Sequence, residues 1–166
     1  GGRGRSRGRA RHGSNIEAEL TLTIEEAHRG GRRTLEITGQ KPIQVNIPQG
    51  VRDGASMRLK GKGSPGAGAG AEPGDLILRI RLQVHPRFRV KDDDLELDLR
   101  ISPWEAALGA TVPVPTIEDE VELRIPAGAQ SGQRLRMRGQ GLSRRKGGRG
   151  DQFVRLLIVV PDSLNS

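Results

Sequence analysis

One β-rich segment occurs twice in this chain, and this tandem repeat limits the possible folds more than any other feature of the sequence. Residues 47–63 begin with Ile-Pro-x-Gly and end with an apolar-Arg-apolar-x-Gly-x-Gly pattern, and residues 125–141 repeat this order 78 positions later. A Gly-Asp pair that precedes a long apolar stretch also occurs twice, at residues 74–75 and 150–151. The chain therefore contains two copies of one structural unit. Each copy has about 70 residues, which is near the lower size limit for an independent core.

Inside each copy, apolar and polar residues alternate with a period of two, which is typical of half-buried β-strands. The alternation is strictest at residues 16–24 and recurs at 35–37, 43–47, 57–59, 78–84, 95–101, 121–125 and 135–137. Gly, Pro and Asp residues separate these stretches, and only residues 24–28 and 103–108 have a helical pattern, each followed by Gly. The sequence predicts an all-β protein with two tandem antiparallel β-sandwich or open-barrel domains, each with one short helix.

The domain boundaries follow from the repeat and from a change in composition. Residues 1–14 consist mainly of Gly and Arg and hold no large apolar side chain, so we expect a disordered linker there. The first domain is expected over residues 15–89 and the second over 90–161, with a short tail at 162–166. Leu, Ile, Val and Phe make up 40 of the 166 residues. This share, about 24%, exceeds the roughly 20% below which chains stay disordered, so the body of the chain should fold.

Several classes of protein are excluded by composition. The chain has no Cys, which rules out a disulfide scaffold, a thiolate zinc site and a Cys nucleophile. No apolar run approaches the ~18 residues of a membrane span, and no signal-peptide pattern opens the sequence. We therefore expect a cytoplasmic protein with no membrane partner.

The net charge of +8 is concentrated in two places. One is the N-terminal segment and the other is a Gly-rich stretch near the end of the second copy; their basic residues are Arg3, Arg5, Arg7, Arg9, Arg11, Arg144, Arg145, Lys146 and Arg149. Such clusters can bind nucleic-acid phosphates through counterion release. The N-terminal segment has no aromatic side chain that could stack on a base, so a solvated linker is the favoured interpretation there.

A search for catalytic motifs gives nothing that supports an enzyme. The three histidines, His12, His28 and His85, stand at no spacing that suggests a catalytic triad, and structural or surface roles are favoured. Residues 92–94 are three Asp without the alternating ligands of a calcium loop, and Gly61-Lys62 is not followed by Ser or Thr as a phosphate-binding loop requires. The sequence predicts no enzyme, no metal site and no cofactor.

Three motifs carry a resemblance to a known family. They are the Ile-Pro-x-Gly segment at residues 47–63 with its repeat, Gly74-Asp75-Leu76 leading to His85-Pro86-x-Phe88, and the segment Pro-Trp-Glu-Ala-x-Leu-Gly at 103–109. In this order, over about residues 16–161, they resemble the C-terminal client-binding region, domains I and II, of the DnaJ family of J-domain co-chaperones. The absence of a Cys-rich insert, whose place residues 63–74 take, is similar to the zinc-free, CbpA-like class.

The chain also departs from the full family pattern. Its only His-Pro pair, His85-Pro86, precedes Arg87 and follows a predicted strand, so it does not indicate a J domain. The Gly/Arg segment stands where the family has a Gly/Phe linker, and the sequence stops before the family's C-terminal dimerisation helix. We expect a fragment that is monomeric, although the full-length protein would be a homodimer. In it, Trp104 and Leu108 are expected to pack on the sheet of the second unit.

The resemblance implies a site as well as a function. Unfolded client polypeptides would bind a shallow apolar groove of the first unit, lined by Ala18, Leu20, Leu35, Ile37 and Leu78. Where the family often has aromatics, Leu35 and Leu78 stand here, which predicts a smaller pocket. Ordinary core packing is an equally favoured interpretation of these five residues from the sequence alone.

The expected function is that of a co-chaperone fragment, which captures unfolded or misfolded polypeptides and presents them to a DnaK-type ATPase chaperone. Arg33 is the candidate contact for the acidic tail of that partner. The alternative is a nucleic-acid-binding protein that uses the basic N-terminal segment and the cluster at 144–149.

Overall fold

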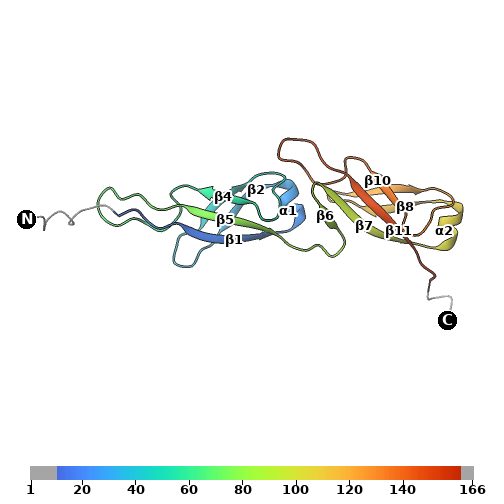
Figure 1. The fold of residues 1–166 in the computed structure, drawn as a ribbon, viewed down its shortest axis with the longest axis horizontal. Coiled ribbons are helices and arrows are strands. Elements are labelled where there is room, and N and C mark those ends of the chain that lie inside the picture. The colour runs from blue at the N-terminus through green and yellow to red at the C-terminus, as the bar shows by residue number, and fades with distance from the viewer. Residues whose placement is uncertain (1–10, 162–166) are drawn as a thin grey trace, which may run out of the picture.

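The computed structural model describes residues 11–161 and contains two β units that follow one another along an elongated molecule (Figure 1). The first unit has a three-stranded sheet in the order β1-β5-β4, a separate hairpin of β2 and β3, and one helix, α1. Their bounds are β1 Ile16–Leu22, α1 Ile24–Arg29, β2 Gly31–Leu35, β3 Ile43–Ile47, β4 Ser56–Leu59 and β5 Leu76–Leu82.

The second unit repeats this arrangement and adds one strand. Its main sheet has the order β10-β11-β7-β6, its hairpin consists of β8 and β9, and α2 takes the place of α1. The bounds are β6 Arg89–Lys91, β7 Asp94–Ile101, α2 Pro103–Leu108, β8 Ala110–Pro115, β9 Glu120–Ile125, β10 Arg134–Met137 and β11 Gln152–Ile158. The added strand, β6, has no counterpart in the first unit.

The predicted all-β class with one short helix in each unit is confirmed, but the sheets are not purely antiparallel. β1 runs parallel to β5, and β7 runs parallel to β11, while the other strand pairs are antiparallel. Parallel neighbours need a long crossover connection. Here a helix, a hairpin and an edge strand lie between β1 and β5 in the sequence, and this length of chain lets β5 return in the same direction.

The repeat extends to individual hydrogen bonds. The side chain of Thr23 accepts the backbone N–H of Glu26, whose carboxylate accepts the N–H of Thr23, and Ser102 and Glu105 form the same capping box in front of α2. Likewise, Asp75 accepts the N–H of Gly61, and Asp151 accepts that of Gly139. The equivalent contacts show that the two units share one local design.

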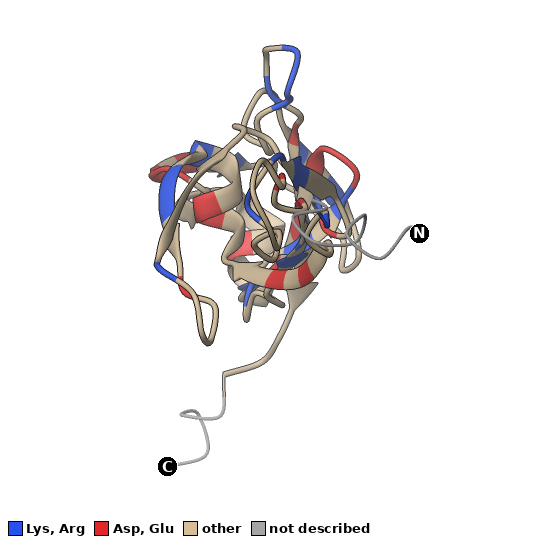
Figure 2. Ribbon diagram, turned by 90° about the vertical axis from the view of Figure 1, so that its left-hand side faces the viewer, with Lys and Arg blue, Asp and Glu red and all other residues tan. Residues whose placement is uncertain are grey.

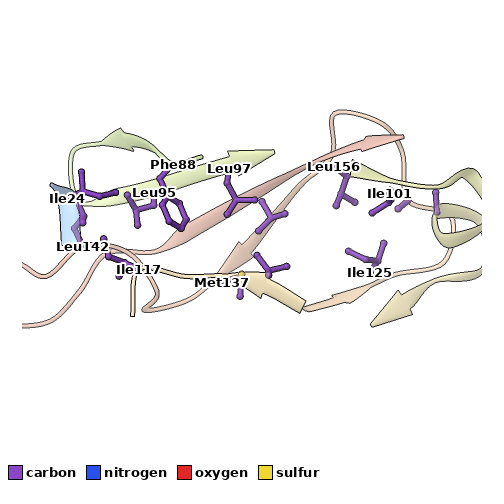
Figure 3. Packing of buried hydrophobic residues seen from close by; sticks show 14 residues of the cluster. Ile24, Phe88, Leu95, Leu97, Ile101, Ile117, Ile125, Met137, Leu142 and Leu156 are labelled. Carbon is purple, nitrogen blue, oxygen red and sulfur yellow. The ribbon is translucent and has the colours of Figure 1, made fainter. Parts of the chain in front are cut away.

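Each unit buries its own apolar core between sheet and hairpin. Leu76, Leu78 and Ile80 of β5 lie at the centre of the first core. In the second core, Val154 and Leu156 of β11 take the places of Leu78 and Ile80, and Leu95 and Leu97 of the neighbouring strand β7 pack with them. Figure 3 labels Leu95, Leu97 and Leu156 in this core. Ile24, although it starts α1 of the first unit, packs in the second core, so the two units share apolar contacts.

The predicted domain boundaries can be compared with the structure at three positions. Residues 1–10 of the expected linker and 162–166 of the expected tail lie outside the described residues. Residues 11–14 are instead paired with the loop at 64–74, because the N–H of Ser64 bonds to the carbonyl of Ser14 and Arg11 pairs with Ala67. Phe88 already packs in the second core. The division after residue 89 stays a prediction.

The expected packing of Trp104 and Leu108 on the sheet is wrong. The side chain of Trp104 is 52% exposed and that of Leu108 is 79% exposed. The six-residue helix α2 instead buries Ala106 beneath it, and its two large side chains point away from the core. Within residues 11–161, no helix is both long and apolar enough to cross a membrane.

Candidate functional site

The five residues predicted to line a groove lie in one cluster of the first unit. Ala18 and Leu20 belong to β1, and Leu78 lies beside Ala18 on the neighbouring strand β5. Leu35 ends β2, and Ile37 follows it in the loop toward β3. All five pack on the first core. The predicted set is therefore brought together in space.

These five side chains are not equally accessible. Leu78 is 0% exposed and Leu35 is 7% exposed, so both belong to the core itself. Ala18, Leu20 and Ile37 are partly exposed. Core packing therefore describes two of the five residues, which are buried. The other three reach the surface above them, as a groove would require.

The exposure of these five residues can be compared with that of the equivalent residues in the second unit. The structurally equivalent residues there are Leu97, Leu99, Val114, Thr116 and Val154. Leu97, Val114 and Val154 are at most 1% exposed, and Thr116 is 7% exposed. Only Leu99 is partly exposed. The same arrangement is therefore more open in the first unit than in the second.

Two other differences between the units accompany the greater burial of these residues in the second unit. In the second unit, β6 pairs with residues 94–96 at the start of β7 and covers the outer edge of that part of the strand. In the first unit, β1 is an outer strand of its sheet, and within residues 11–161 no strand pairs with its free edge. The hairpin loop is also longer in the first unit, residues 36–42 against 116–119. The edge beside Ala18 and Leu20 is thus available for an added strand.

The outer face of the same strands has a different character. A hollow of about 380 Å³ lies there, lined by Glu17, Ala18, Glu19, Ile77, Arg79 and Arg81. Arg81 donates a hydrogen bond to Glu19, which raises the pKa of the arginine. This polar hollow shares only Ala18 with the predicted set, so the apolar character belongs to the opposite, core-facing side of β1.

Arg33 borders a second, smaller pocket of about 210 Å³ at the end of α1. Arg33 forms an ion pair with Glu26, while Arg29 and Arg32, which line the same pocket, have no ion pair within the described part of the chain. Because Gly30 connects the helix to β2 between these side chains, three arginines gather at one opening. The sequence analysis identified only one of them, although the spacing of Arg29, Arg32 and Arg33 carried the signal.

The basic cluster at 144–149 lies on a loop that projects beside the junction of the two units (Figure 1), and Figure 2 shows basic residues at its tip. Arg144 donates hydrogen bonds to Asp93 and to the carbonyl of Arg149, and Arg149 donates one to the carbonyl of Gly141. These two side chains therefore stabilise the loop. Arg145 and Lys146 are exposed and have no ion pair among residues 11–161.

The N-terminal basic residues are mostly beyond the structure. Arg3, Arg5, Arg7 and Arg9 lie outside the described residues. Arg11 is exposed, and its backbone pairs with that of Ala67.

A buried contact between the two units, which the sequence analysis did not identify, centres on His28. Its Nδ1 atom accepts the backbone N–H of Ser143 at 2.9 Å, and its Nε2 atom lies 2.6 Å from a carboxylate oxygen of Glu118. The Ser143 hydroxyl also donates to the carbonyl of His28 at 2.6 Å. The interpretation of His28 as a structural histidine is confirmed, since it joins α1 to the second unit.

Arg52 forms a second link between the units. Its guanidinium donates hydrogen bonds to the carbonyls of Gly50 and Ser143 and to the carboxylate of Asp93. Hydrogen bonds from Arg52 and Arg144 hold the pKa of Asp93 below its ordinary value. These contacts could not be predicted from a sequence motif, because Arg52 is 41 positions from Asp93 and 91 positions from Ser143 in the sequence.

The described residues contain no arrangement typical of catalysis or metal binding. No three His, Asp or Glu side chains within residues 11–161 are placed to hold a metal ion. His85 accepts the backbone N–H groups of Arg87 and Phe88 and so shapes the turn before β6. Four of the six large apolar residues that are exposed within residues 11–161 lie at the far end of the second unit: Trp104 and Leu108 on α2, and Val159 and Val160 beyond β11, where the N–H of Val159 bonds to the carbonyl of Ile101 just before α2. The other two are Val84 and Val90.

Comparison with known proteins gives a consistent result. The sequence profile of the DnaJ C terminal domain family matches residues 16–161. A Curved DNA-binding protein of Pseudomonas syringae pv. tomato is 44% identical over 95% of this chain and 54% of its own length. A DnaJ-like protein of Synechocystis sp. is 43% identical over 87% of this chain and 43% of its own length. The chain thus spans about half the length of the curated relatives it matches.

Proposed function

The chain belongs to the DnaJ C terminal domain family, and from this premise we propose that it binds unfolded or misfolded polypeptides and presents them to a DnaK-type ATPase chaperone. The family supports a role of the co-chaperone type. Client capture by the first unit, and a cytoplasmic site of action, are the finer parts of the proposal. Binding would not require a cofactor or a chemical step by the chain.

The observation that carries this proposal is the difference between the two copies of one unit. Both units have the same sheet, hairpin and capped helix, yet Ala18, Leu20 and Ile37 reach the surface where most of their counterparts are buried. Burial of apolar side chains stabilises a fold, so a unit that leaves them accessible gives up part of that stability. A binding role explains why the first unit keeps them accessible.

The geometry suits an extended polypeptide. A segment added to a free strand edge makes main-chain hydrogen bonds that do not depend on its sequence. A large apolar side chain of that segment, packed over Ala18, Leu20 and Ile37, would contribute on the order of 1.5–3 kcal/mol. After the entropy cost of association this corresponds to weak binding, roughly in the micromolar range. Weak binding suits a protein that must release its client.

Exchange of Leu20 for Glu tests the groove. Leu20→Glu places a charge among the apolar side chains, and we expect it to weaken binding of a fluorescently labelled apolar peptide by about tenfold or more. The matched control is Leu99→Glu, at the equivalent and equally half-buried position of the second unit. Fluorescence anisotropy gives the affinity, and thermal unfolding confirms that both variants fold. Equal affinities of the two folded variants would refute the groove.

The arginine pocket at the end of α1 is the proposed contact for the acidic tail of the DnaK-type partner. Arg29, Arg32 and Arg33 can together face several carboxylates, and among the residues that the structure describes only Arg33 has an acidic partner, Glu26. We expect Arg32→Glu to abolish binding of an acidic tail peptide while leaving binding of an apolar client peptide unchanged. Loss of both activities, or of neither, would contradict the assignment.

Nucleic-acid binding is the second candidate function. It is favoured by the exposed side chains of Arg145 and Lys146, which have no ion pair among residues 11–161 and lie in the turn of a projecting loop. One of the relatives cited above is named Curved DNA-binding protein. A duplex DNA gel shift tests it: the double variant Arg145→Ala/Lys146→Ala should weaken binding and reduce its salt dependence. A chain without residues 1–10 measures the contribution of the N-terminal arginines separately.

Dimerisation is proposed to involve the distal end of the second unit. Trp104, Leu108, Val159 and Val160 form an exposed apolar end there, which a second copy could cover in the full-length protein. The chain of residues 1–166 is proposed to be monomeric. Light scattering on this chain and on a full-length protein tests both statements.

A further inference from the structure

A second basic pocket lies beside the arginine pocket at the end of α1. This junction pocket has a volume of about 430 Å³ and lies between the two units. Residues 50–52 and Ala55 of the first unit line it together with Asp93 and residues 144–146 of the second. The projecting loop of the second unit therefore meets the first unit here (Figure 1).

The loop presents Arg145 and Lys146 in a fixed turn. Main-chain hydrogen bonds between Arg144 and residues 147–148 close this turn. The corresponding loop of the first unit, residues 64–73, contains no basic residue. The side chains of Arg145 and Lys146 have no ion pair among residues 11–161. The two cations are thus not needed to close the loop, and they can contact a partner.

Two consecutive residues of the main chain connect the arginine pocket with the junction pocket. Gly30 lines the arginine pocket, and a Cβ atom on it would lie 2.7 Å from the backbone nitrogen of Gln49. The next residue, Gly50, lines the junction pocket, and a Cβ atom there would lie 2.6 Å from the carbonyl oxygen of Ser143 and 2.9 Å from the backbone nitrogen of Arg145. Because the Cα atoms of consecutive residues are ~3.8 Å apart, one extended polypeptide segment can reach both pockets.

The side chains that line the two pockets carry a large excess of positive charge. Seven of them are basic, and two are acidic, Glu26 and Asp93. Glu26 already binds Arg33. Asp93 already binds both Arg52 and Arg144. The other four cations are exposed and have no ion pair in the part of the chain that the structure describes: Arg29, Arg32, Arg145 and Lys146. This excess selects an anionic occupant.

The apolar part of the junction pocket favours a polypeptide over a nucleic acid. Val51 and Ala55 form an apolar wall beside the cations. An acidic polypeptide can place an apolar side chain against this wall while its carboxylates face the basic side chains. A phosphate backbone has no apolar side chain to place there. Among the described residues, no aromatic ring on which a base could stack lines either pocket.

We propose that the two pockets form one docking strip for the acidic tail of the DnaK-type partner, which occupies the arginine pocket and continues across the junction to Arg145 and Lys146. This inference rests on the proposed function, where the arginine pocket alone is the contact for that tail. It adds that the second unit takes part in binding, and that the tail places an apolar side chain over the junction pocket between its carboxylates.

Two fluorescently labelled peptides test the docking strip by fluorescence anisotropy. The short peptide has about five residues, mostly Glu and Asp, and fits the arginine pocket alone. The long peptide adds about five more acidic residues and one Leu, and at ~3.3 Å per extended residue it also reaches the junction pocket. We expect the chain to bind the long peptide about tenfold more tightly than the short one.

The double variant Arg145→Ala/Lys146→Ala should remove this advantage, so that both peptides bind with the affinity of the short one. The matched control is Lys60→Ala/Lys62→Ala, which removes the same charge from two exposed lysines that line neither pocket. The control should bind the long peptide as tightly as the unmodified chain does. Thermal unfolding confirms that both variants fold.

A change in the long peptide tests the apolar wall without altering the protein. Replacement of its Leu by Ser keeps every charge and removes the side chain that would pack on Val51 and Ala55. We expect about fivefold weaker binding of the Ser peptide to the unmodified chain. Equal affinities of the Leu and Ser peptides would overturn the apolar contact and with it the argument for a polypeptide at the junction pocket.

The outcomes separate the docking strip from the proposed function. If Arg32→Glu abolishes binding of both peptides while Arg145→Ala/Lys146→Ala changes neither affinity, the site ends at the arginine pocket, and the proposed function stands without its extension. If Arg32→Glu also changes neither affinity, both assignments fail. A DNA duplex that binds more tightly than the long peptide at the same salt concentration, and loses affinity in the double variant, would assign the loop to nucleic acid and overturn the docking strip.

Discussion

At the scale of single residues, the glycines at the strand ends explain how the loops of this fold close. A Cβ atom on Gly150 would lie 2.1 Å from the carbonyl oxygen of Asp93, and one on Gly74 would lie 2.1 Å from that of Ser14. The main chains of two segments therefore touch at each of these positions. The sequence repeat marked both glycines, and their lack of room for a side chain is the physical reason for their place in it.

Gly150→Ala should consequently destabilise the second unit. The added methyl group meets main chain, which cannot turn aside, so we expect a loss of roughly 1–3 kcal/mol in the free energy of unfolding. Urea denaturation measures this change. Gly139→Ala is the control, because Gly139 has a φ of 73° but no neighbouring atom within 4 Å, and its cost should stay near the ~1 kcal/mol of left-handed backbone alone. A smaller loss for Gly150→Ala than for Gly139→Ala would contradict the steric argument.

At the scale of elements, local patterns predicted helices and strands well but not their partners. The helices expected at 24–28 and 103–108 are found at Ile24–Arg29 and Pro103–Leu108, because capping residues and glycines act within a few positions. The parallel pairing of β1 with β5 was not predictable, since alternation fixes which face a side chain takes and not which strand lies beside it. For the same reason the sequence could group the five residues of the predicted groove but could not predict that Leu35 and Leu78 are buried while the other three are partly exposed.

The capping boxes allow a test in which each unit serves as a control for the other. Ser102→Ala removes the oxygen that accepts the N–H of Glu105, and Thr23→Ala removes the one that accepts the N–H of Glu26. Each should cost about 1 kcal/mol of stability, measured by urea denaturation. A much larger loss of stability for Thr23→Ala would mean that the cap of α1 also stabilises the junction between the units, because His28 of α1 bonds to the second unit. Equal and negligible effects would show that neither cap stabilises its helix.

At the scale of the whole molecule, the junction between the units combines an apolar contact with polar contacts, some of which are buried. Ile24 packs in the second core, while His28 and Arg52 bind Ser143, Glu118 and Asp93 around it. This combination fixes how the two units are oriented relative to each other. The sequence offered no means to find it, since each partner looks like an ordinary surface residue until the chain is folded.

Acid should loosen this junction. A hydrogen bond from His28 lowers the pKa of Glu118, and hydrogen bonds from Arg52 and Arg144 lower that of Asp93. Because both folded-state pKa values lie below the ordinary 4.5 and 3.8, their contribution to stability is present above those values and is lost as the pH falls through the lower, folded-state values. Protonation of the two carboxylates then removes their attraction to the histidine and the arginines.

Spin labels on two exposed positions measure this loosening directly, for example at Lys41→Cys in the first unit and Arg124→Cys in the second. We expect one narrow distance distribution near neutral pH and a broad one once the pH has fallen below the lowered pKa values of Asp93 and Glu118, while circular dichroism still reports folded strands. With Asp93→Asn and Glu118→Gln added, the distribution should already be broader at neutral pH and depend less on acid. A distribution that stays narrow until the strands themselves unfold would mean that the apolar contact of Ile24 and the hydrogen bonds of Ser143 hold the two units together without the two carboxylates.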